Sequence, residues 1–238
     1  MASLLAKAFF DESLFGQVMH PHRNQYPDDV KIFWSEYLWK HWKIPNERLF
    51  VATTTIDGEE KIAGVATWRR DGDDEGKRKV ESEWVDIGKY HCNSPESTRV
   101  TNSSTDIDAF QPLPSTQNRA LDPSQRNILD ESFPYFKHHW AGDRINNWYL
   151  DLCGVHPDYA GKRLGQALVG WGLDRAREEG LHASATASKG TERFHLQCGF
   201  EEVVGNCTQG KGNPMKGVVD GGNVLFMFPK QKQQDVGV

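Results

Sequence analysis

The sequence predicts a mixed α/β fold, because segments with helical spacing alternate with β-rich runs along the chain. Three observations carry this prediction: apolar residues at helical spacing over 30–42, two β-rich runs joined by Asp57-Gly58, and a strand, short loop and helix in direct succession over 147–179. Hydrophobic residues make up 37% of the 238 residues, which is enough to form a buried core. We expect a single domain over 1–238, with a polar, partly mobile insertion at about 71–120.

Two helices and a hairpin are expected before this insertion. Residues 4–19 and 30–42 carry apolar side chains at helix-compatible spacing. The runs LFVATTT from Leu49 and KIAGVATWRR from Lys61 are rich in strand-forming residues, and Asp57-Gly58 lies between them. Because this dipeptide is typical of a two-residue hairpin turn, the two runs are predicted to form an antiparallel pair.

The segment after the insertion is predicted to return the chain to the core through a helix and a central strand. Asp122 is expected to cap a helix that runs to about His139, with Pro123 at its first position. The run NWYLDLCGV, from Asn147 to Val155, is short, apolar and bounded by turn formers. Such a run is typical of a strand that is buried on both faces, so we place it at the centre of the sheet.

The last third is predicted to alternate helices and strands. A helix over 163–179 is expected to stop at Gly180, and a strand follows over 181–187. Ser188 is expected to cap a short helix that ends at Gly199. The final strand, NVLFMF, comes after a glycine-rich loop over 205–222 and is a candidate for strand pairing between two copies in a homodimer.

Composition excludes several classes of partner. The net charge is −5 and no block of Lys or Arg occurs, so neither nucleic acid nor an anionic membrane is an expected partner. Asp11 and Glu12 interrupt the apolar start, and nowhere do about 18 uncharged apolar residues run together, so no signal peptide or membrane span is expected. The four cysteines lack CxxC spacing, which favours reduced thiols and a cytoplasmic location.

The loop VHPDYAGKRLG has the features of an anion site. It leads from the central strand into a helix N-terminus, where unpaired backbone N–H groups and the helix dipole favour negative charge. Gly161 and Gly165 allow a phosphate to approach the backbone, and Lys162 and Arg163 add positive charge. Such a loop suits a pyrophosphate, although a purely structural β–α turn with two glycines is the alternative.

Longer motifs resemble those of GNAT acetyltransferases. The segment YLDLCGVHPDYAGKRLGQALVGWGLDRAREEGL is similar to the acetyl-CoA-binding region of that family, in which V-x-P leads to R/Q-x-x-G-x-G/A and a helix. The segment ASKGTERFHLQCGF resembles the second signature, which closes here on Gly199-Phe200, and HPHRNQYPDDVKIFW and KIAGVATWRR resemble the N-terminal part of fungal members. The resemblance implies the GNAT fold, a central mixed, mostly antiparallel twisted sheet flanked by helices.

The resemblance also implies acetyl-CoA as the cosubstrate. The strand around Cys153 is expected to splay from its neighbour, to bind the pantetheine arm, and to present a backbone N–H to the thioester oxygen. The residues assigned to acetyl-CoA are Cys153, Gly154, Val155, Ala160, Gly161, Lys162, Arg163, Leu164, Gly165, Gln166 and Ser188.

Two positions of the loop depart from the family pattern. Ala160 stands where the family has Arg or Gln, and Arg163 stands where it has its central Gly. The Cβ of Arg163 crowds the approach of a phosphate, but its guanidinium can pair with one. We expect altered binding of acetyl-CoA, not its loss.

Two residues are catalytic candidates by the same resemblance. His195 stands where family members commonly place a Tyr that protonates the departing CoA thiolate, and Asp151 stands where some carry the acidic residue that deprotonates the amine. His195 packed on a helix and Asp151 as a buried structural carboxylate are the alternatives. Cys153 has no activating base nearby in the sequence and is assigned to the core.

The acceptor is expected to be a primary amine of a small molecule, attacked directly in a ternary complex. Tyr149 and Trp34 are the predicted substrate contacts, although the aromatic run that contains Trp34 is equally typical of a core. The histidine pairs His20 and His22, and His138 and His139, lack carboxylate or cysteine partners at metal-ligand spacing, so no metal is predicted. The alternatives are a degenerate acyl-CoA-binding protein, a hydroxyl acceptor, or a longer acyl donor.

Overall fold

The computed structural model describes residues 1–90 and 117–229, and a six-stranded sheet forms its centre. The strand order is β1-β2-β3-β4-β6-β5. Neighbouring strands are antiparallel except β3 and β4, which run parallel. The predicted mixed, mostly antiparallel sheet is therefore confirmed. The strands are β1 (Glu47–Ile56), β2 (Glu59–Asp71), β3 (Asn147–Val155), β4 (His182–Ser188), β5 (Glu202–Asn206) and β6 (Gly221–Met227).

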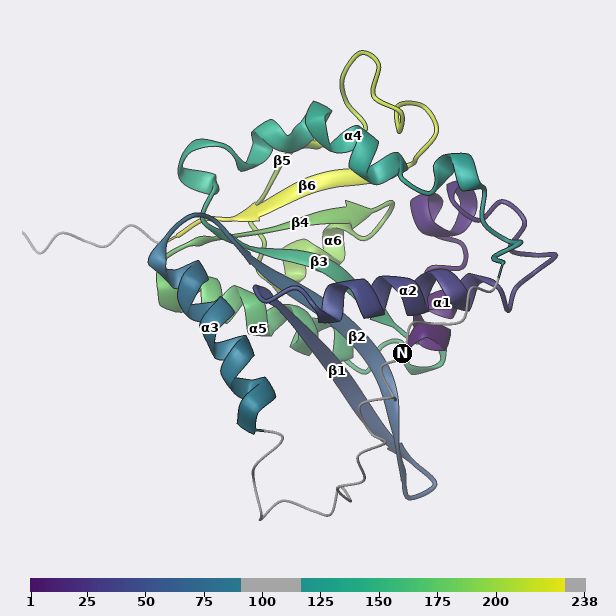
Figure 1. The fold of residues 1–238 in the computed structure, drawn as a ribbon, viewed down its shortest axis with the longest axis horizontal. Helices are drawn as coiled ribbons and strands as arrows, with labels where there is room; N and C mark the ends of the chain where they lie inside the picture. The colour runs from purple at the N-terminus through teal and green to yellow at the C-terminus, as the bar shows by residue number, and fades with distance from the viewer. Residues whose placement is uncertain (91–116, 230–238) are drawn as a thin grey trace, which may run out of the picture.

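Helices cover both faces of this sheet, as Figure 1 shows. One face packs against α1 (Ala2–Ala8) and α2 (Val30–Trp42). The helix α4 (Ile128–Phe136) packs in a separate apolar cluster with the N-terminal segment and the loop after β5. The other face packs against α5 (Leu164–Glu179) and α6 (Glu192–Cys198). In the described part of the chain, none of the helices is both long and apolar enough to cross a membrane.

The hairpin of β1 and β2 forms where the sequence places it. Asp57 and Gly58 both have positive φ, of 52° and 80°. These are the conformations that a type I′ turn requires, and its twist matches that of the flanking strands. The antiparallel register then runs from Ile56 opposite Glu59 to Glu47 opposite Arg69.

A helix, α3 (Glu75–Tyr90), occupies the first part of the segment that was predicted to be a polar insertion. Among its described side chains only Val80 is buried. Arg70, whose side chain is 1% exposed, connects its start to the core through ion pairs of 2.6 Å with Asp74 and 2.9 Å with Glu179. Residues 91–116, which contain most of the rest of the expected mobile stretch, lie outside the described residues.

Two predicted helices are interrupted. Within 4–19, α1 ends at Ala8 and a π-helix begins at Ser13. Glu12 caps this π-helix by accepting a 2.7 Å hydrogen bond from the Phe15 N–H. Within 122–139, Asp122 and Pro123 begin a short turn as predicted, but this turn is separate from α4. The short helical segments are Ser13–Val18 (π) and, as 3-10 turns, Pro123–Gln125, Lys137–Trp140, Gly142–Arg144 and Pro157–Tyr159.

Two expectations near the C-terminus are wrong. Ser188 ends β4 and does not cap α6, whose N-cap is Thr191; the Ser188 carbonyl accepts the Thr191 N–H instead. The run NVLFMF lies in β6, which pairs with β4 on one side and with the unpredicted β5 on the other. Because both edges of β6 are paired, this strand offers no free edge to a second copy.

Candidate functional site

A β-bulge at Asp151 opens the sheet at its centre. Thr67 of β2 pairs with Leu152 and Trp68 pairs with Leu150, so Asp151 is the extra residue of β3. On the other side of β3, parallel pairing with β4 stops at Leu150 opposite Ala185, although β3 continues to Val155. The predicted splay around Cys153 is therefore present, and the bulge lies where it starts.

The bulge also reverses which face each β3 side chain occupies. Trp148 and Leu150 pack in the core beneath α5, whereas Leu152 packs beneath α1 and α2. Since side chains of a regular strand alternate, the change from Leu150 to Leu152 requires one extra residue. Asp151 and Leu152 consequently both face the N-terminal helices, and Cys153 returns to the α5 side.

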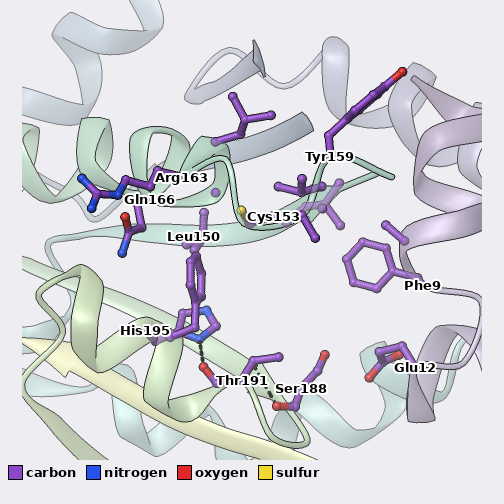
Figure 2. A pocket seen from close by; sticks show the side chains of 18 of the residues that line it. Phe9, Glu12, Leu150, Cys153, Tyr159, Arg163, Gln166, Ser188, Thr191 and His195 are labelled. Atoms are coloured by element: carbon purple, nitrogen blue, oxygen red, sulfur yellow. Dashed lines mark hydrogen bonds between the residues drawn. The ribbon is translucent and has the colours of Figure 1, made fainter. Parts of the chain in front are cut away.

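The splayed strands enclose a cleft of about 550 Å³, here called the interstrand cleft. Figure 2 shows Arg163 and Gln166 on the side formed by the start of α5, His195 and Thr191 on the side of α6, and Phe9 and Glu12 from the N-terminal segment. The predicted acetyl-CoA and catalytic residues all line it: Asp151, Cys153, Gly154, Val155, Ala160, Gly161, Lys162, Arg163, Leu164, Gly165, Gln166, Ser188 and His195.

The start of α5 presents unpaired donors to this cleft. In the described part of the chain, the backbone N–H groups of Gly161, Lys162 and Arg163 have no hydrogen-bond partner, and the Ala167 N–H makes the first bond, of 3.1 Å, to the Arg163 carbonyl. Lys162 and Arg163 also lack a carboxylate partner there. Free donors, two cations and a helix N-terminus together suit a pyrophosphate.

Arg163 adopts a left-handed backbone conformation, with φ 60° and ψ 13°. This conformation is costly for a residue with a Cβ and free for glycine. The position at which the family pattern has its central Gly is therefore one where the turn itself requires positive φ. Arg163 satisfies the turn at an energetic cost and adds a guanidinium at the mouth of the cleft.

His195 lies in the cleft as an uncharged ring. Its side chain is largely buried, and its Nδ1 lies 2.8 Å from the Thr191 carbonyl, which can only accept a hydrogen bond. Burial lowers the pKa of His195, because desolvation disfavours the charged imidazolium. The neutral ring carries its proton on Nδ1 and offers an Nε2 lone pair, an arrangement that opposes proton donation at neutral pH.

Asp151 lies in a network of polar side chains. Its Oδ2 accepts a short hydrogen bond from the Tyr37 hydroxyl, and its Oδ1 lies 3.3 Å from Arg69 Nη1. The hydroxyl of Tyr37 has a raised pKa, because it is buried and lies beside the Asp151 carboxylate. Asp151 is thus placed in the cleft and is also held by the contacts that a structural carboxylate needs.

A second cavity of about 410 Å³, here called the adjoining cavity, shares five lining residues with the interstrand cleft: Glu12, Phe15, Asp151, Thr186 and Ser188. The predicted substrate contact Tyr149 lines it. Trp34 does not: it is fully buried among Phe9, Phe15 and Phe33, so it belongs to the core, as the aromatic spacing also allowed. The prediction of Trp34 as a substrate contact is therefore wrong.

Several lining residues were not predicted. Tyr37 and His41, which are four residues apart, follow the buried Trp34 along α2. The available signal was that these polar side chains continue an apolar stripe of the helix. Arg69 and Glu12 also line the adjoining cavity. Their strand and turn give no local sign of the site, because only tertiary folding brings them to β3.

Cys153 lies at the cleft as a protonated thiol. Burial raises its pKa to about 12, since the thiolate is poorly solvated there. The assignment of Cys153 to the core, and not to a nucleophilic role, agrees with this environment. Cys153, Cys198 and Cys207 are free thiols.

Comparisons with known proteins identify what this chain is similar to. Residues 133–200, which contain β3, the loop, α5 and α6, match the model of the acetyltransferase (GNAT) family. Over this segment the chain is similar to GNAT acetyltransferases. No curated protein sequence is significantly similar to it.

Two solved structures are similar to this chain at low sequence identity, and the first of them shares its fold. One, described as histone acetyltransferase HPA2 and related acetyltransferase from Corynebacterium glutamicum, is 14% identical with a TM-score of 0.52, over 98% of this chain and 91% of that chain. Another, described as an acetyltransferase, is 15% identical with a TM-score of 0.41, over 96% and 95%. The GNAT fold supports acyl transfer from acetyl-CoA in general, and the resemblance to fungal members stays a prediction.

Proposed function

We propose that this protein transfers the acetyl group of acetyl-CoA to a primary amine of a small molecule, by direct attack within a ternary complex. The observation that carries the proposal is the meeting of the two cavities at Glu12, Phe15, Asp151, Thr186 and Ser188. One cavity then holds the thioester and the other holds the amine, and the two reactants meet where the strands separate. Holding both reactants in one geometry supplies much of the acceleration.

The interstrand cleft supplies the proposed contacts to acetyl-CoA. The free N–H groups of Gly161 to Arg163 face the pyrophosphate, and the guanidinium of Arg163 pairs with it. Beyond Leu150 the edge of β3 has no partner in β4, so its backbone is free to pair with the amide groups of pantetheine. A backbone N–H near Val155 is the proposed donor to the thioester oxygen.

The adjoining cavity favours a basic acceptor. Among its described lining side chains, the carboxylates Glu12, Glu36, Asp130, Asp151 and Asp220 outnumber the cations Lys40, Arg69 and Arg126. An excess of carboxylates attracts an ammonium group and repels an acidic acceptor. A volume of about 410 Å³ suits a small molecule.

The roles of the predicted catalytic pair are proposals of unequal strength. Asp151 and Glu12 are the carboxylates that line both cavities, and Asp151 is the one that lies on the splayed strand β3. His195 lies in the cleft, but its lowered pKa and its bond to Thr191 mean that it is an acid only when the solution is acidic enough to protonate it. At neutral pH we assign His195 to contact with the acetyl-CoA thioester and not to proton donation.

The test is amine-dependent release of CoA, measured with a panel of mono- and diamines. The wild type is expected to release CoA with at least one amine, and Arg163→Glu is expected to raise the KM for acetyl-CoA by about 10- to 100-fold through loss of a charge-assisted hydrogen bond. Titration calorimetry should show the same loss in acetyl-CoA affinity.

Arg175→Glu is the matched control, because Arg175 lies on the same helix, is exposed, and lines neither cavity. It makes the same change in charge and should leave the KM unchanged. Binding of acetyl-CoA without release by any amine would reduce the proposal to an acyl-CoA-binding protein. Release only with alcohols would move the acceptor from an amine to a hydroxyl.

A further inference from the structure

We infer that His41, oriented by the buried carboxylate of Glu47, is the general base that takes the proton from the acceptor amine. The inference rests on the proposed function and assigns the base within it. His41 lies in the last turn of α2 and Glu47 begins β1, so the pair joins two elements at the wall of the adjoining cavity.

The contact with Glu47 fixes the tautomer of the ring. His41 Nδ1 lies 2.7 Å from Glu47 Oε2, and the Glu47 side chain is 2% exposed. A carboxylate can only accept, so the neutral ring carries its proton on Nδ1. Its Nε2 has no hydrogen-bond partner among the described residues, while the ring lines the adjoining cavity. A lone pair is therefore directed away from Glu47 and is free for an amine.

The ring is also held in one orientation. It stacks on Tyr37 at a centroid distance of 3.9 Å and an interplanar angle of 20°, and Tyr37 in turn donates its hydroxyl proton to Asp151. A base that is locked by a carboxylate on one nitrogen and by stacking on its face is pre-organised for proton transfer.

Charged groups from three strands and from α2 surround His41. Glu47 from β1 and Asp151 from β3 face its Nδ1, at 2.7 Å and 3.6 Å. Arg69 from β2 opposes them, but it lies 2.8 Å from Asp71, 3.3 Å from Asp151 and 3.6 Å from Glu47 and so is shared among three carboxylates. Lys40 of α2 lines the same cavity. The two carboxylates stabilise the positive charge that develops on the ring.

Asp151 is less available for this task. Tyr37 donates to one of its oxygens and Arg69 approaches the other. Proton uptake by Asp151 would weaken both contacts, whereas His41 Nε2 gives up no hydrogen bond. We therefore assign Asp151 to positioning and His41 to proton transfer.

The transfer balances in protons and electrons. An N–H bond of the ammonium breaks, its electron pair stays on nitrogen as the nucleophile, and an N–H bond forms at His41 Nε2. The amine nitrogen bonds to the thioester carbon, and the C–S bond breaks with its electron pair on sulfur. The new amide nitrogen then passes its surplus proton to the CoA thiolate, and His41 releases its proton to solvent.

The first experiment compares His41→Gln with wild type. The kcat should fall by about 100- to 10,000-fold with the KM for acetyl-CoA unchanged. The acidic limb of the pH profile of kcat/KM should disappear, and imidazole in solution should partly restore the rate of His41→Ala. Glu47→Gln should give a smaller fall in kcat. His22→Gln, at an exposed histidine outside both cavities, is the control and should match wild type.

The outcomes separate this inference from the proposed function. Turnover by wild type with an unchanged rate and pH profile in His41→Gln would overturn the inference and leave the acetyltransferase intact. An acidic limb that is lost only in Asp151→Asn would assign the base to Asp151. No amine-dependent turnover by wild type would remove both proposals.

A second readout does not depend on activity. Long-range ¹H–¹⁵N spectra, assigned with His41→Gln, should show the neutral His41 ring protonated on Nδ1. A ring protonated on Nε2 would overturn the inference. One donor atom each of His41, Glu47 and Asp151 lies within 4.8 Å of the others, which is close enough for the three to hold a metal ion. The same spectra are therefore also recorded with added Zn²⁺. Loss of turnover in EDTA with restoration by Zn²⁺ would replace the base by a metal site.

Discussion

At the scale of one residue, Arg163 meets two separate requirements, one set by the backbone conformation of the turn and one set by ligand binding. The turn into α5 needs a positive φ, and the cleft needs positive charge near the free N–H groups. Glycine meets the first demand without strain and arginine meets the second. The chain has arginine at this position, so the loop gains a cation and loses part of its conformational stability.

We predict that Arg163→Gly raises the free energy of unfolding. The left-handed conformation costs a non-glycine residue about 1–2 kcal/mol, and glycine loses about 0.5–1 kcal/mol through its unfolded-state entropy, so a gain of about 0.5–1 kcal/mol remains. Urea denaturation without ligand measures it. Arg163→Ala keeps the Cβ and should show no gain; equal stability of both variants would mean that the turn is not strained.

Residues of the site were predictable where one continuous segment supplies them. The loop from Ala160 to Gln166 follows a strand and starts a helix, so its local pattern was sufficient. His41, Glu47 and Arg69 come from three separate elements, and their approach to Asp151 depends on the sheet register. Trp34 was misassigned, because a helix stripe of aromatic residues does not show which side faces a cavity.

At the scale of the element, α5 packs closely because it contains glycine. A Cβ at Gly172 would overlap the indole of Trp68, a fully buried side chain on β2, whereas a Cβ at Gly170 would meet nothing within 4 Å. Trp68 in turn donates a 3.0 Å hydrogen bond from Nε1 to the Leu168 carbonyl. Because Gly172 has no side chain, α5 can lie close to the sheet at this point.

We predict opposite effects for the two glycines. Gly172→Ala should destabilise the fold by about 1–3 kcal/mol through overpacking against Trp68. Gly170→Ala should be neutral or should stabilise by up to about 1 kcal/mol, because alanine has the higher helix propensity. Thermal and urea denaturation measure both. A mild Gly172→Ala would show that the indole can move aside.

Elements were predicted well where their own periodicity was complete. The bounds of α2 and β3 match the predicted 30–42 and 147–155, and the hairpin follows its turn signal. The strand β5 was missed, since it is short and includes Gly205. A Cβ at Gly205 would overlap the ring of His139, so a contact distant in sequence explains a residue that is unfavourable in a strand.

At the scale of the whole molecule, buried histidines link stability to pH. Burial lowers the pKa of His20, His139, His182 and His195, in each case chiefly by desolvation. The folded pKa values therefore lie below the unfolded value of about 6.5. Between these values the unfolded chain binds more protons, so acid favours unfolding.

We predict that the free energy of unfolding is highest above about pH 7 and falls as the pH decreases below about 6.5, down to the lowered folded pKa values. Urea denaturation from pH 8 to pH 5 measures this slope. His195→Gln should reduce the slope, and His22→Gln at an exposed position should not. A stability that rises on acidification would mean that the buried rings gain, and do not lose, proton affinity on folding.

The bulge at Asp151 makes the cleft depend on the number of residues in β3 as well as on their chemistry. Without that residue, Leu150 and Leu152 would follow each other in a regular ladder opposite Trp68 and Thr67, and β3 could continue alongside β4. A scan that replaces each β3 side chain in turn would leave this ladder defect in place. Deletion of the single codon for Asp151 would remove the bulge. Insertions and deletions, and not substitutions alone, therefore decide whether such a sheet can hold a ligand between its strands.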